Sequence, residues 1–395
     1  MLFITSYAPH GVGGSAIILH NLLRYVPLRR VVFLTSRQNV KSYPLVNDPL
    51  PCPTYYFDST PSARITRYFL YLFSHMAKLG ILNQCYLALM MAIGIRKIVS
   101  TGMRLIKEQG FDSLALTTDP GLALIGGYCL ARRTRLPYSI IYFDPYVGNN
   151  FGWVLNLVSM AYEPRLLRNA QNVIVCGDAL ETALSRRVQR EYVSLPISVD
   201  VPRKPPDFVQ GRPKVFRILY AGAVYWAQVD TIRSFVDAVG ALGVEFLVYS
   251  HQKKEELARM GVEGSHVRYG FLAKKELLKF QHSVDLLYLP LSFRKEYKKV
   301  IEVATASKIC EYMTSGRPIL LHAPAYAYIV KYAVRENFAH VVTSADPEKI
   351  RQNLIMLMRD AAHRKRLAEN AWRIVKTYHN AKRNSNILTD TLSLA

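Results

Sequence analysis

The sequence is short of acidic residues, and this shortage directs attention to negatively charged partners. The chain has 29 Asp and Glu residues against 51 Lys and Arg residues, for a formal net charge of +22 at pH 7. Such a surface attracts a phosphorylated substrate, an anionic bilayer or nucleic acid. The basic residues are spread through the chain, and the sequence has no helix-turn-helix, zinc-finger or RNA-binding-sheet motif. We therefore expect no nucleic-acid partner.

Cysteine is also scarce, which argues against a disulfide framework. The five thiols are widely separated, and no two stand at metal-ligand spacing. The N-terminus lacks the basic, apolar and small-residue pattern of a signal peptide, because residues 1–6 have the pattern of a strand that leads into a glycine loop. We expect a cytoplasmic protein that needs no metal and no cofactor.

The length of 395 residues exceeds one ordinary hydrophobic core and predicts two domains. Short apolar runs separated by helical patterns predict parallel strands in two α/β, doubly wound, Rossmann-like domains. The expected strands are 2–5, 31–35, 113–117, 138–143, 172–176, 216–220, 245–249, 266–269, 285–289, 318–322 and 340–343. A proline-rich segment then sets the boundaries. We expect an N-terminal domain at 1–200, a linker at 201–214, a C-terminal domain at 215–365, and helices at 366–395 that return to the first domain.

Two glycine loops follow the first strand of each expected domain. The first contains Gly13 and Gly14 ahead of a helix, and the second contains Gly222 and ends near Gln228. At the carboxyl end of a strand, each loop could present backbone amides to a phosphate, or serve only as a turn. The first loop lacks the G-x-G-x-x-G spacing, which argues against a nicotinamide enzyme. His10 beside it is a weaker candidate.

The most informative stretch is residues 307–320, which read SKICEYMTSGRPIL. Ile309 and Met313 are expected to form the buried side of a short helix that Gly316 ends. Lys308 and Glu311 stand one turn apart on another face. The pair could bind a nucleotide or be a solvated surface pair.

This stretch resembles the signature of retaining GT-B glycosyltransferases of family four, in particular the bacterial polysaccharide branch. The resemblance extends to the first glycine loop, the Gly222 loop with Gln228, the turn at 269–271 and the last helices. It implies a nucleoside diphosphate sugar donor, bound mainly by the second domain in a cleft between the two. Glu311 would bind the ribose hydroxyls, Gly13, Gly14 and the Gly222 loop would approach the diphosphate, and Lys308 would neutralise the leaving phosphate.

The sequence departs from that family at two places. A second glutamate, eight positions before Glu311 in many relatives, is replaced by Val303, with Glu302 beside it and Glu296 further back. The basic clamp that follows the second glycine loop in relatives is missing from 223–228. Lys308 or one of Arg294, Lys295, Lys298 and Lys299 would have to supply the charge.

The resemblance also points to Asp144, which follows the strand expected at 138–143. Relatives often place a His or Asp there against the transferred sugar or the acceptor, whereas an Asx turn before Pro145 is the alternative. We therefore expect catalytic roles for Asp144, Lys308 and Glu311. The expected donor-binding residues are Gly13, Gly14, Gly222, Gln228, Ser307 and Glu311.

The expected function is transfer of a sugar, of hexosyl type and with retention, from a nucleoside diphosphate sugar to a hydroxyl. The resemblance implies a glycan or lipid-linked acceptor in polysaccharide and cell-envelope biosynthesis. The alternatives are a non-catalytic sugar-nucleotide-binding subunit and a nucleotide-sugar epimerase of the same layout. A donor assay separates them, since an epimerase converts the donor without an acceptor and a binding subunit does not turn it over.

Residues 64–107 predict a further partner, an anionic membrane surface. Aromatic residues at 68–73 and an uncharged stretch at 79–95 are framed by basic residues that include Arg64, Arg67, Arg96 and Lys97. The uncharged run is too short and too often interrupted for a spanning helix. Peripheral binding at the inner face of the cell membrane is one reading. Core helices with solvated basic faces are the other.

Overall fold

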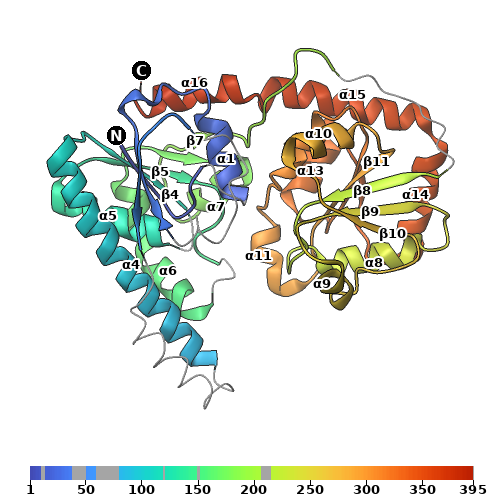
Figure 1. Cartoon of the computed structure of the whole chain (residues 1–395), viewed down its shortest axis with the longest axis horizontal. Coiled ribbons are helices and arrows are strands. Elements are labelled where there is room, and N and C mark those ends of the chain that lie inside the picture. The colour runs from blue at the N-terminus through green and yellow to red at the C-terminus, as the bar shows by residue number, and fades with distance from the viewer. Residues whose placement is uncertain are drawn as a thin grey trace. The chain divides into compact units, whose positions relative to one another are not determined.

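The chain divides into two units, each of which is a parallel α/β domain (Figure 1). The computed structural model describes residues 1–9, 14–37, 50–58, 80–118, 121–148, 152–205 and 215–394, with the side chains of 80–83 left out. Unit 1 comprises Met1–Ile197 and Ala381–Ala395, and unit 2 comprises Ser198–Asn380. The chain thus leaves unit 1 once and returns to it for its last residues.

Unit 1 is built on a parallel sheet in the order β3-β2-β1-β4-β5-β6-β7. Its strands are β1 (Leu2–Thr5), β2 (Val32–Ser36), β3 (Thr54–Phe57), β4 (Leu114–Thr117), β5 (Tyr138–Tyr142), β6 (Val173–Val175) and β7 (Val193–Ser194). β1, β2, β4, β5 and β6 are buried along their whole length, as continuous apolar runs in parallel sheets require. The order reverses between β1 and β4, so the loops after these strands lie at a switch point.

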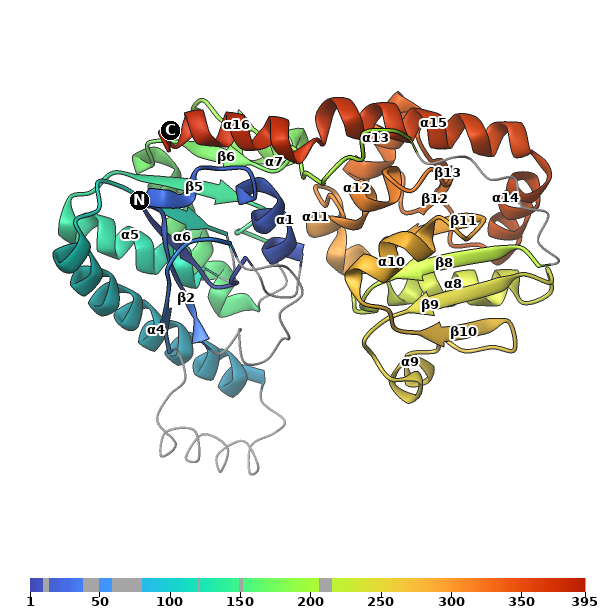
Figure 2. The ribbon, with the colours of Figure 1, turned by 45° about the horizontal axis from the view of Figure 1, so that its top comes forward.

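The helices of unit 1 cover both faces of its sheet. They are α1 (Gly14–Leu23), η1 (Leu28–Arg30), α4 (Gly80–Gln109), α5 (Leu122–Thr134), α6 (Trp153–Asn169), α7 (Asp178–Ser185) and α16 (Ala381–Thr391). α5 packs on β4 and on α4. A Cβ at Gly126 of α5 would stand only 2.8 Å from the Ile98 side chain of α4, so glycine permits this close approach. α16 packs on α1 (Figure 2). The Ser385 hydroxyl donates a hydrogen bond to the Leu22 carbonyl.

Unit 2 repeats the same topology with six strands in the order β10-β9-β8-β11-β12-β13. They are β8 (Arg217–Ala221), β9 (Glu245–Tyr249), β10 (Val267–Gly270), β11 (Leu286–Pro290), β12 (Ile319–His322) and β13 (His340–Val342). The reversal lies between β8 and β11, which places the loop after β8 at the second switch point.

The helices of unit 2 are α8 (Val229–Val239), α9 (Lys254–Arg259), α10 (Lys274–Gln281), η2 (Lys295–Tyr297), α11 (Lys298–Ile301), α12 (Lys308–Met313), α13 (Tyr328–Glu336), α14 (Pro347–Arg359) and α15 (Ala361–Tyr378). α8 and α14 pack on each other over one face of the sheet, around Tyr220, Phe246 and Tyr288. The short helix α12 packs on β11 and α15. The sheet and α15 together fix the position of α12.

The strands differ from the expected set only at the sheet margins. Every expected strand is present within one or two residues, while β3 and β7 were not expected. The first unit ends at 197, and α15 belongs to unit 2, so only α16 of the expected returning helices packs on unit 1. Residues 206–214 of the expected linker lie outside the described residues, as do Arg64, Arg67 and the aromatic residues at 68–73.

Candidate functional site

The loop after β8 brings a backbone glycine and a lysine into close contact. Gly222 has a φ of +137°, a conformation that side-chain-bearing residues rarely adopt. A Cβ at this position would overlap Cε and Nζ of Lys308. Glycine is therefore required twice here, once for the backbone conformation and once for the approach of the ammonium group.

Three side chains hold the Gly222 loop in place. The Tyr312 hydroxyl accepts a hydrogen bond from the Ala221 amide at 3.0 Å, and the Tyr220 hydroxyl donates to the Ala223 carbonyl at 2.6 Å. The Gln252 carboxamide accepts from the Val224 amide at 2.7 Å. Because Tyr312 belongs to α12, its bond ties the glycine loop to the helix that carries Lys308.

The helix α12 forms as the sequence predicts. Ile309 and Met313 are fully buried, and Gly316 follows the helix with a φ of +68°. Lys308 is its first residue, and Ser307 precedes it without capping the helix through its hydroxyl. Ser307 is thus next in the chain to the lysine that approaches Gly222, and its hydroxyl does not cap α12.

Lys308 is half-buried, and its charge is costly in this environment. Its Nζ lies 5.1 Å from the centre of the Tyr220 ring, a cation–π distance. Loss of water around the ammonium lowers the pKa of Lys308 to about 8, although the Glu311 carboxylate acts in the opposite direction. The ammonium is therefore charged at neutral pH, and a second negative charge nearby would stabilise it.

Glu311 lies between two lysines and retains 17% of its side-chain exposure. Its Oε1 is 3.9 Å from Nζ of Lys274, which is too long for a hydrogen bond. Burial raises the pKa of the Glu311 carboxyl, and the positive charges of Lys274 and Lys308 lower it. Lys274, the first residue of α10, was not identified from the sequence. The turn at 269–271, part of the resemblance, was the available signal.

Gln228 is buried at the start of α8. Its residue is 6% exposed, and its side-chain oxygen has no hydrogen-bond partner among the described residues. An unsatisfied buried carbonyl is unfavourable, because its desolvation is not offset. This oxygen is available to a ligand, as the expected donor-binding role of Gln228 requires. The structure gives no contact between Gln228 and Lys308.

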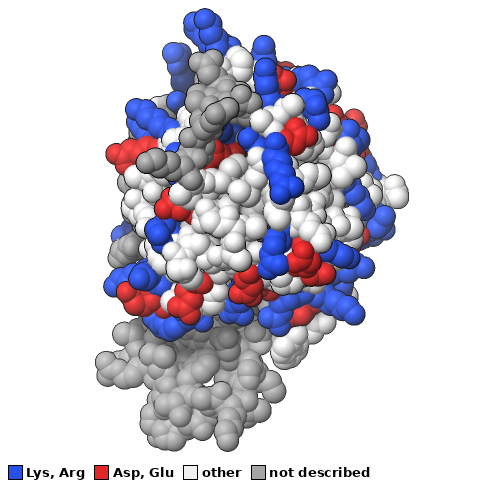
Figure 3. Space-filling model, turned by 90° about the vertical axis from the view of Figure 1, so that its right-hand side faces the viewer, with Lys and Arg blue, Asp and Glu red and all other residues white. Residues whose placement is uncertain are grey.

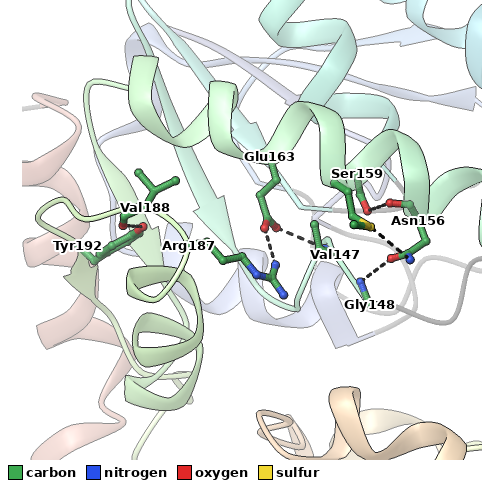
Figure 4. A network of polar contacts seen from close by, with 9 residues as sticks. Val147, Gly148, Asn156, Ser159, Glu163, Arg187, Val188 and Tyr192 are labelled. Atoms are coloured by element: carbon green, nitrogen blue, oxygen red, sulfur yellow. Dashed lines mark hydrogen bonds and ion pairs between the residues drawn. The ribbon is translucent and has the colours of Figure 1, made fainter.

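The second candidate region is the loop after β5 in unit 1, which carries Asp144. The Thr118 hydroxyl accepts from the Phe143 amide at 2.7 Å. The Asn156 side chain accepts from the Gly148 amide at 2.9 Å (Figure 4). Glu163 accepts from the Val147 amide at 3.3 Å and forms an ion pair with Arg187 at 2.5 Å. The loop is thus held at both ends by side chains of α6 and of the segment after β4.

Asp144 itself is exposed, unlike the residues that hold its loop. The protein around it raises the pKa of its carboxyl through desolvation. Because the residue reaches solvent, water limits this effect. Glu163, whose side chain is 1% exposed, is the buried acid of this region and was not identified from the sequence.

The remaining candidates are divided among the two units. Gly14 begins α1 in unit 1 and is exposed, whereas Gly13 and His10 lie outside the described residues. In unit 2, Arg294 pairs with Glu296 at 2.5 Å, and Lys298 faces the Tyr326 ring at 5.4 Å. Lys308 is therefore the basic residue that the structure places against the Gly222 loop.

Metal binding and membrane spanning concern the described residues as a whole. The described ranges contain no group of three or more His, Cys, Asp or Glu residues placed to hold a metal ion, and the expectation of a metal-independent protein stays a prediction. One described helix segment, residues 84–109 of α4, is long and apolar enough to cross a membrane by length and composition, and an 18-residue apolar stretch of it is 22% buried within the protein.

Comparison with known proteins identifies the fold. No family model and no curated protein sequence matches this chain. Similar solved structures include Anabaena HepE in complex with UDP-glucose, with 17% identity, a TM-score of 0.67, and coverage of 100% of this chain and 99% of that one. Sucrose-phosphate synthase of Thermosynechococcus elongatus has 14% identity, a TM-score of 0.69, and coverage of 99% and 98%.

A third similar structure is a glycosyltransferase from Rickettsia africae. It has 11% identity and a TM-score of 0.64, and the match covers 100% of this chain and 98% of that one. At these identities the likeness establishes the fold. The expected fold class, two doubly wound Rossmann-like domains of the GT-B type, is confirmed.

Proposed function

We propose that the protein transfers a sugar from a nucleoside diphosphate sugar to a hydroxyl acceptor, with the donor bound by unit 2. The observation that carries this proposal is the approach of the Lys308 ammonium to Gly222 at the switch point of the unit 2 sheet. Ligands of open α/β sheets bind at such points. HepE, which shares the fold, has been crystallised with UDP and with UDP-glucose, and this supports a nucleotide-sugar donor.

The charges around α12 fit the two polar parts of such a donor. The Lys308 ammonium would bind the diphosphate and stabilise the negative charge that develops on it as the sugar leaves. Glu311, one turn further along α12, would accept hydrogen bonds from the ribose hydroxyls. Nζ of Lys274 lies 3.9 Å from Glu311, and the ribose hydroxyls would replace part of this ion pair.

The finer features of the proposal come from the family resemblance. These are retention of anomeric configuration, a hexosyl group, no requirement for a metal, and a glycan or lipid-linked acceptor in polysaccharide synthesis. Asp144 is the proposed residue on the acceptor side, because it is exposed on a loop whose backbone amides bind three side chains, Thr118, Asn156 and Glu163. Arg187 in turn pairs with Glu163. A positioned carboxylate can orient an acceptor hydroxyl.

A non-catalytic sugar-nucleotide-binding subunit is the second candidate. The specific observation in its favour is Val303, which stands where many relatives have a glutamate, together with the lack of a basic residue at 223–228. In this candidate, unit 2 would still bind the donor through Lys308 and Glu311. Only turnover distinguishes it from the enzyme.

Donor binding and turnover should be measured separately. Isothermal titration of the full chain with UDP, GDP and UDP-glucose is expected to give binding that is weakened in Lys308→Ala and unchanged in Lys279→Ala, an exposed lysine of α10. Release of nucleoside diphosphate from the donor, with and without acceptor glycans, then tests transfer. Binding without release would favour the binding subunit, conversion of the donor sugar alone would favour an epimerase, and no binding of any nucleotide would overturn the proposal.

A further inference from the structure

The outer side of α6 carries large apolar residues that the fold does not use. Trp153, Leu157 and Met160 are 57%, 57% and 55% exposed. Their spacing places them along one side of the helix. The opposite side of α6 supplies the packing of unit 1, with Leu155, Leu166 and Leu167 buried. The exposed stripe therefore contributes little to the stability of the fold.

The neighbouring end of α4 is apolar on all sides. Residues 84–95 contain no charged residue, and Gly94 alone among them is buried. A Cβ at Gly152, just before α6, would overlap the Gln84 side chain, so the start of α6 lies against this end of α4. α4 and α6 also pack on each other. Residues 84–95 and the stripe of α6 thus form one surface, which we call the α4–α6 face.

The charges next to the α4–α6 face are basic. Arg96 and Lys97 directly follow its α4 part and are exposed. On α6, Arg165 is exposed and donates a hydrogen bond to the Ala161 carbonyl, which brings it within one turn of Met160. The one acid of α6, Glu163, is buried, and residues 80–107 contain no acid. On the face drawn in Figure 3, by contrast, acidic side chains stand among the basic ones.

We propose that the α4–α6 face docks on an anionic lipid bilayer. A helix segment that is apolar on every side is at home in a protein core or in lipid. The core of unit 1 takes up only part of residues 84–95, because Met91 and Ile95 pack against it while Cys85 and Ala92 are exposed. Trp is favoured at the interface between water and hydrocarbon, and Lys and Arg beside it attract anionic headgroups. The partner is therefore a membrane surface with negative charge.

The same residues indicate that α4 does not cross the bilayer. Residues 84–95 span about 18 Å as a helix, whereas the hydrocarbon core is about 30 Å thick. The rest of α4 is committed to the core of unit 1, where Ile98 and Leu105 are fully buried. The apolar end can enter the interface while the other end stays in the protein.

The decisive experiment is co-sedimentation of the full chain with vesicles. Binding is expected with phosphatidylcholine and phosphatidylglycerol in equal parts at low salt, and not with phosphatidylcholine alone. Leu157→Asp combined with Met160→Asp should reduce the bound fraction at least tenfold. Met356→Asp, at an exposed methionine of α14 in unit 2, should leave it unchanged. Matching melting curves would show that the variants are folded.

A spectroscopic measurement checks the geometry independently. Insertion of Trp153 should shift tryptophan emission to shorter wavelength on vesicle addition, and Trp153→Phe should abolish the shift. Arg96→Glu with Lys97→Glu should reduce binding to the anionic vesicles. Vesicle binding that survives the Leu157 and Met160 changes would overturn the proposal. A lipid-free dimer that those changes convert to a monomer would also overturn it, since a second copy of the chain would then cover the face.

Discussion

Glu163 in unit 1 and Glu311 in unit 2 are both carboxylates in largely buried surroundings, but they are partnered differently. Burial raises the pKa of each. Glu163 is 1% exposed and is bound by Arg187 at 2.5 Å and by the Val147 amide. Glu311 keeps 17% exposure and faces Lys274 at 3.9 Å. Each carboxylate oxygen of Glu163 therefore has a close partner within the protein, whereas Glu311 faces a cation beyond hydrogen-bond distance.

This difference separates a residue that holds the fold from one that can receive a ligand. A buried carboxylate whose two oxygens already have close partners in the protein has little to gain from a ligand. A carboxylate whose nearest cation is beyond hydrogen-bond distance can instead accept hydrogen bonds from a pair of ligand hydroxyls. Burial and a raised pKa alone would have ranked the two acids together. Their partners assign Glu163 to the support of the Asp144 loop and Glu311 to the proposed donor site.

The largest expected effect concerns turnover in unit 2. Lys308→Ala should lower kcat by about 10²- to 10³-fold, because loss of a group that stabilises developing charge costs about 2.7–4 kcal/mol in the barrier. Donor affinity should fall less. Steady-state kinetics with Lys279→Ala as the control test this. Weaker donor binding with kcat unchanged would mean an equal loss in the ground state and the transition state, and Lys308 would then be a binding residue only.

On the other side of the comparison, Arg187→Met should destabilise unit 1 by about 3 kcal/mol at neutral pH. That is the low end for breaking a buried pair, because the Arg187 side chain is itself 39% exposed and Glu163 can take up a proton once its partner is gone. The pKa of Glu163 should then lie further above its unfolded value, so the loss should shrink as pH falls toward the normal carboxyl range. Urea unfolding at pH 5 and pH 7.5 measures this.

The adjacent Arg186→Met provides the control, since Arg186 is exposed as Arg187 is, while the ion pair of Glu163 is with Arg187. A variant at Arg187 as stable as this control would remove the structural role assigned to Glu163. Nucleotide affinity should be unchanged in both variants, because the proposed donor site lies in unit 2.

Glu311→Gln should show the reverse pattern, with weaker donor binding and little loss of stability. The substitution keeps the shape of the side chain and removes a charge-assisted interaction of about 1.5–3 kcal/mol with the ribose hydroxyls. Titration calorimetry against Glu276→Gln, an exposed acid of α10, checks the prediction. Unchanged affinity in the folded variant would take Glu311 out of the donor site.

The affinity for a nucleoside diphosphate should depend on pH through Lys308. Burial lowers the pKa of Lys308 to about 8, and the diphosphate needs the protonated form. Affinity should therefore be retained below pH 8 and fall as the pH rises above it, by at most about tenfold per pH unit. Titrations between pH 6.5 and 9.5 should show this decline, and it should be absent in Lys308→Met.

The smallest effect is expected for Lys274→Met. Its ion pair with Glu311 is long, and both side chains are partly exposed, so stability should change by no more than about 1 kcal/mol. Thermal unfolding compared with Lys275→Met, the exposed neighbour, is the measurement. A much larger loss would mean that Lys274 completes the bonding of Glu311, and the contrast with Glu163 would disappear.

The central strands and the helix of Lys308 and Glu311 could be predicted from the sequence, because their patterns are local. A run of buried apolar residues marks a parallel strand, and a helix stopped by Gly316 marks α12. The strands at the margins of the unit 1 sheet could not be predicted in this way. β3 is mostly half-buried and β7 has two residues, so neither presents a buried run.

The partners of the candidate residues were also beyond sequence patterns. Lys274 faces Glu311 across 37 positions of chain, and Arg187 reaches Glu163 from the segment that follows α7. Such contacts follow from how α10 and α12, or α6 and α7, pack on their sheets. The Lys308 approach to Gly222 likewise requires knowing that β8 and α12 are neighbours.

The return of α16 to unit 1 has a consequence for synthesis on the ribosome. Unit 1 lacks its last helix until the whole of unit 2, residues 198–380, has been translated. At about 5–20 residues per second, that delay is roughly ten to forty seconds. Throughout it, the site on α1 that receives Ser385 has no cover from α16, and the Asn172 side chain lacks its hydrogen bond to the Thr391 carbonyl. Unit 2, made of one continuous segment, can therefore complete its fold before the unit that emerges first.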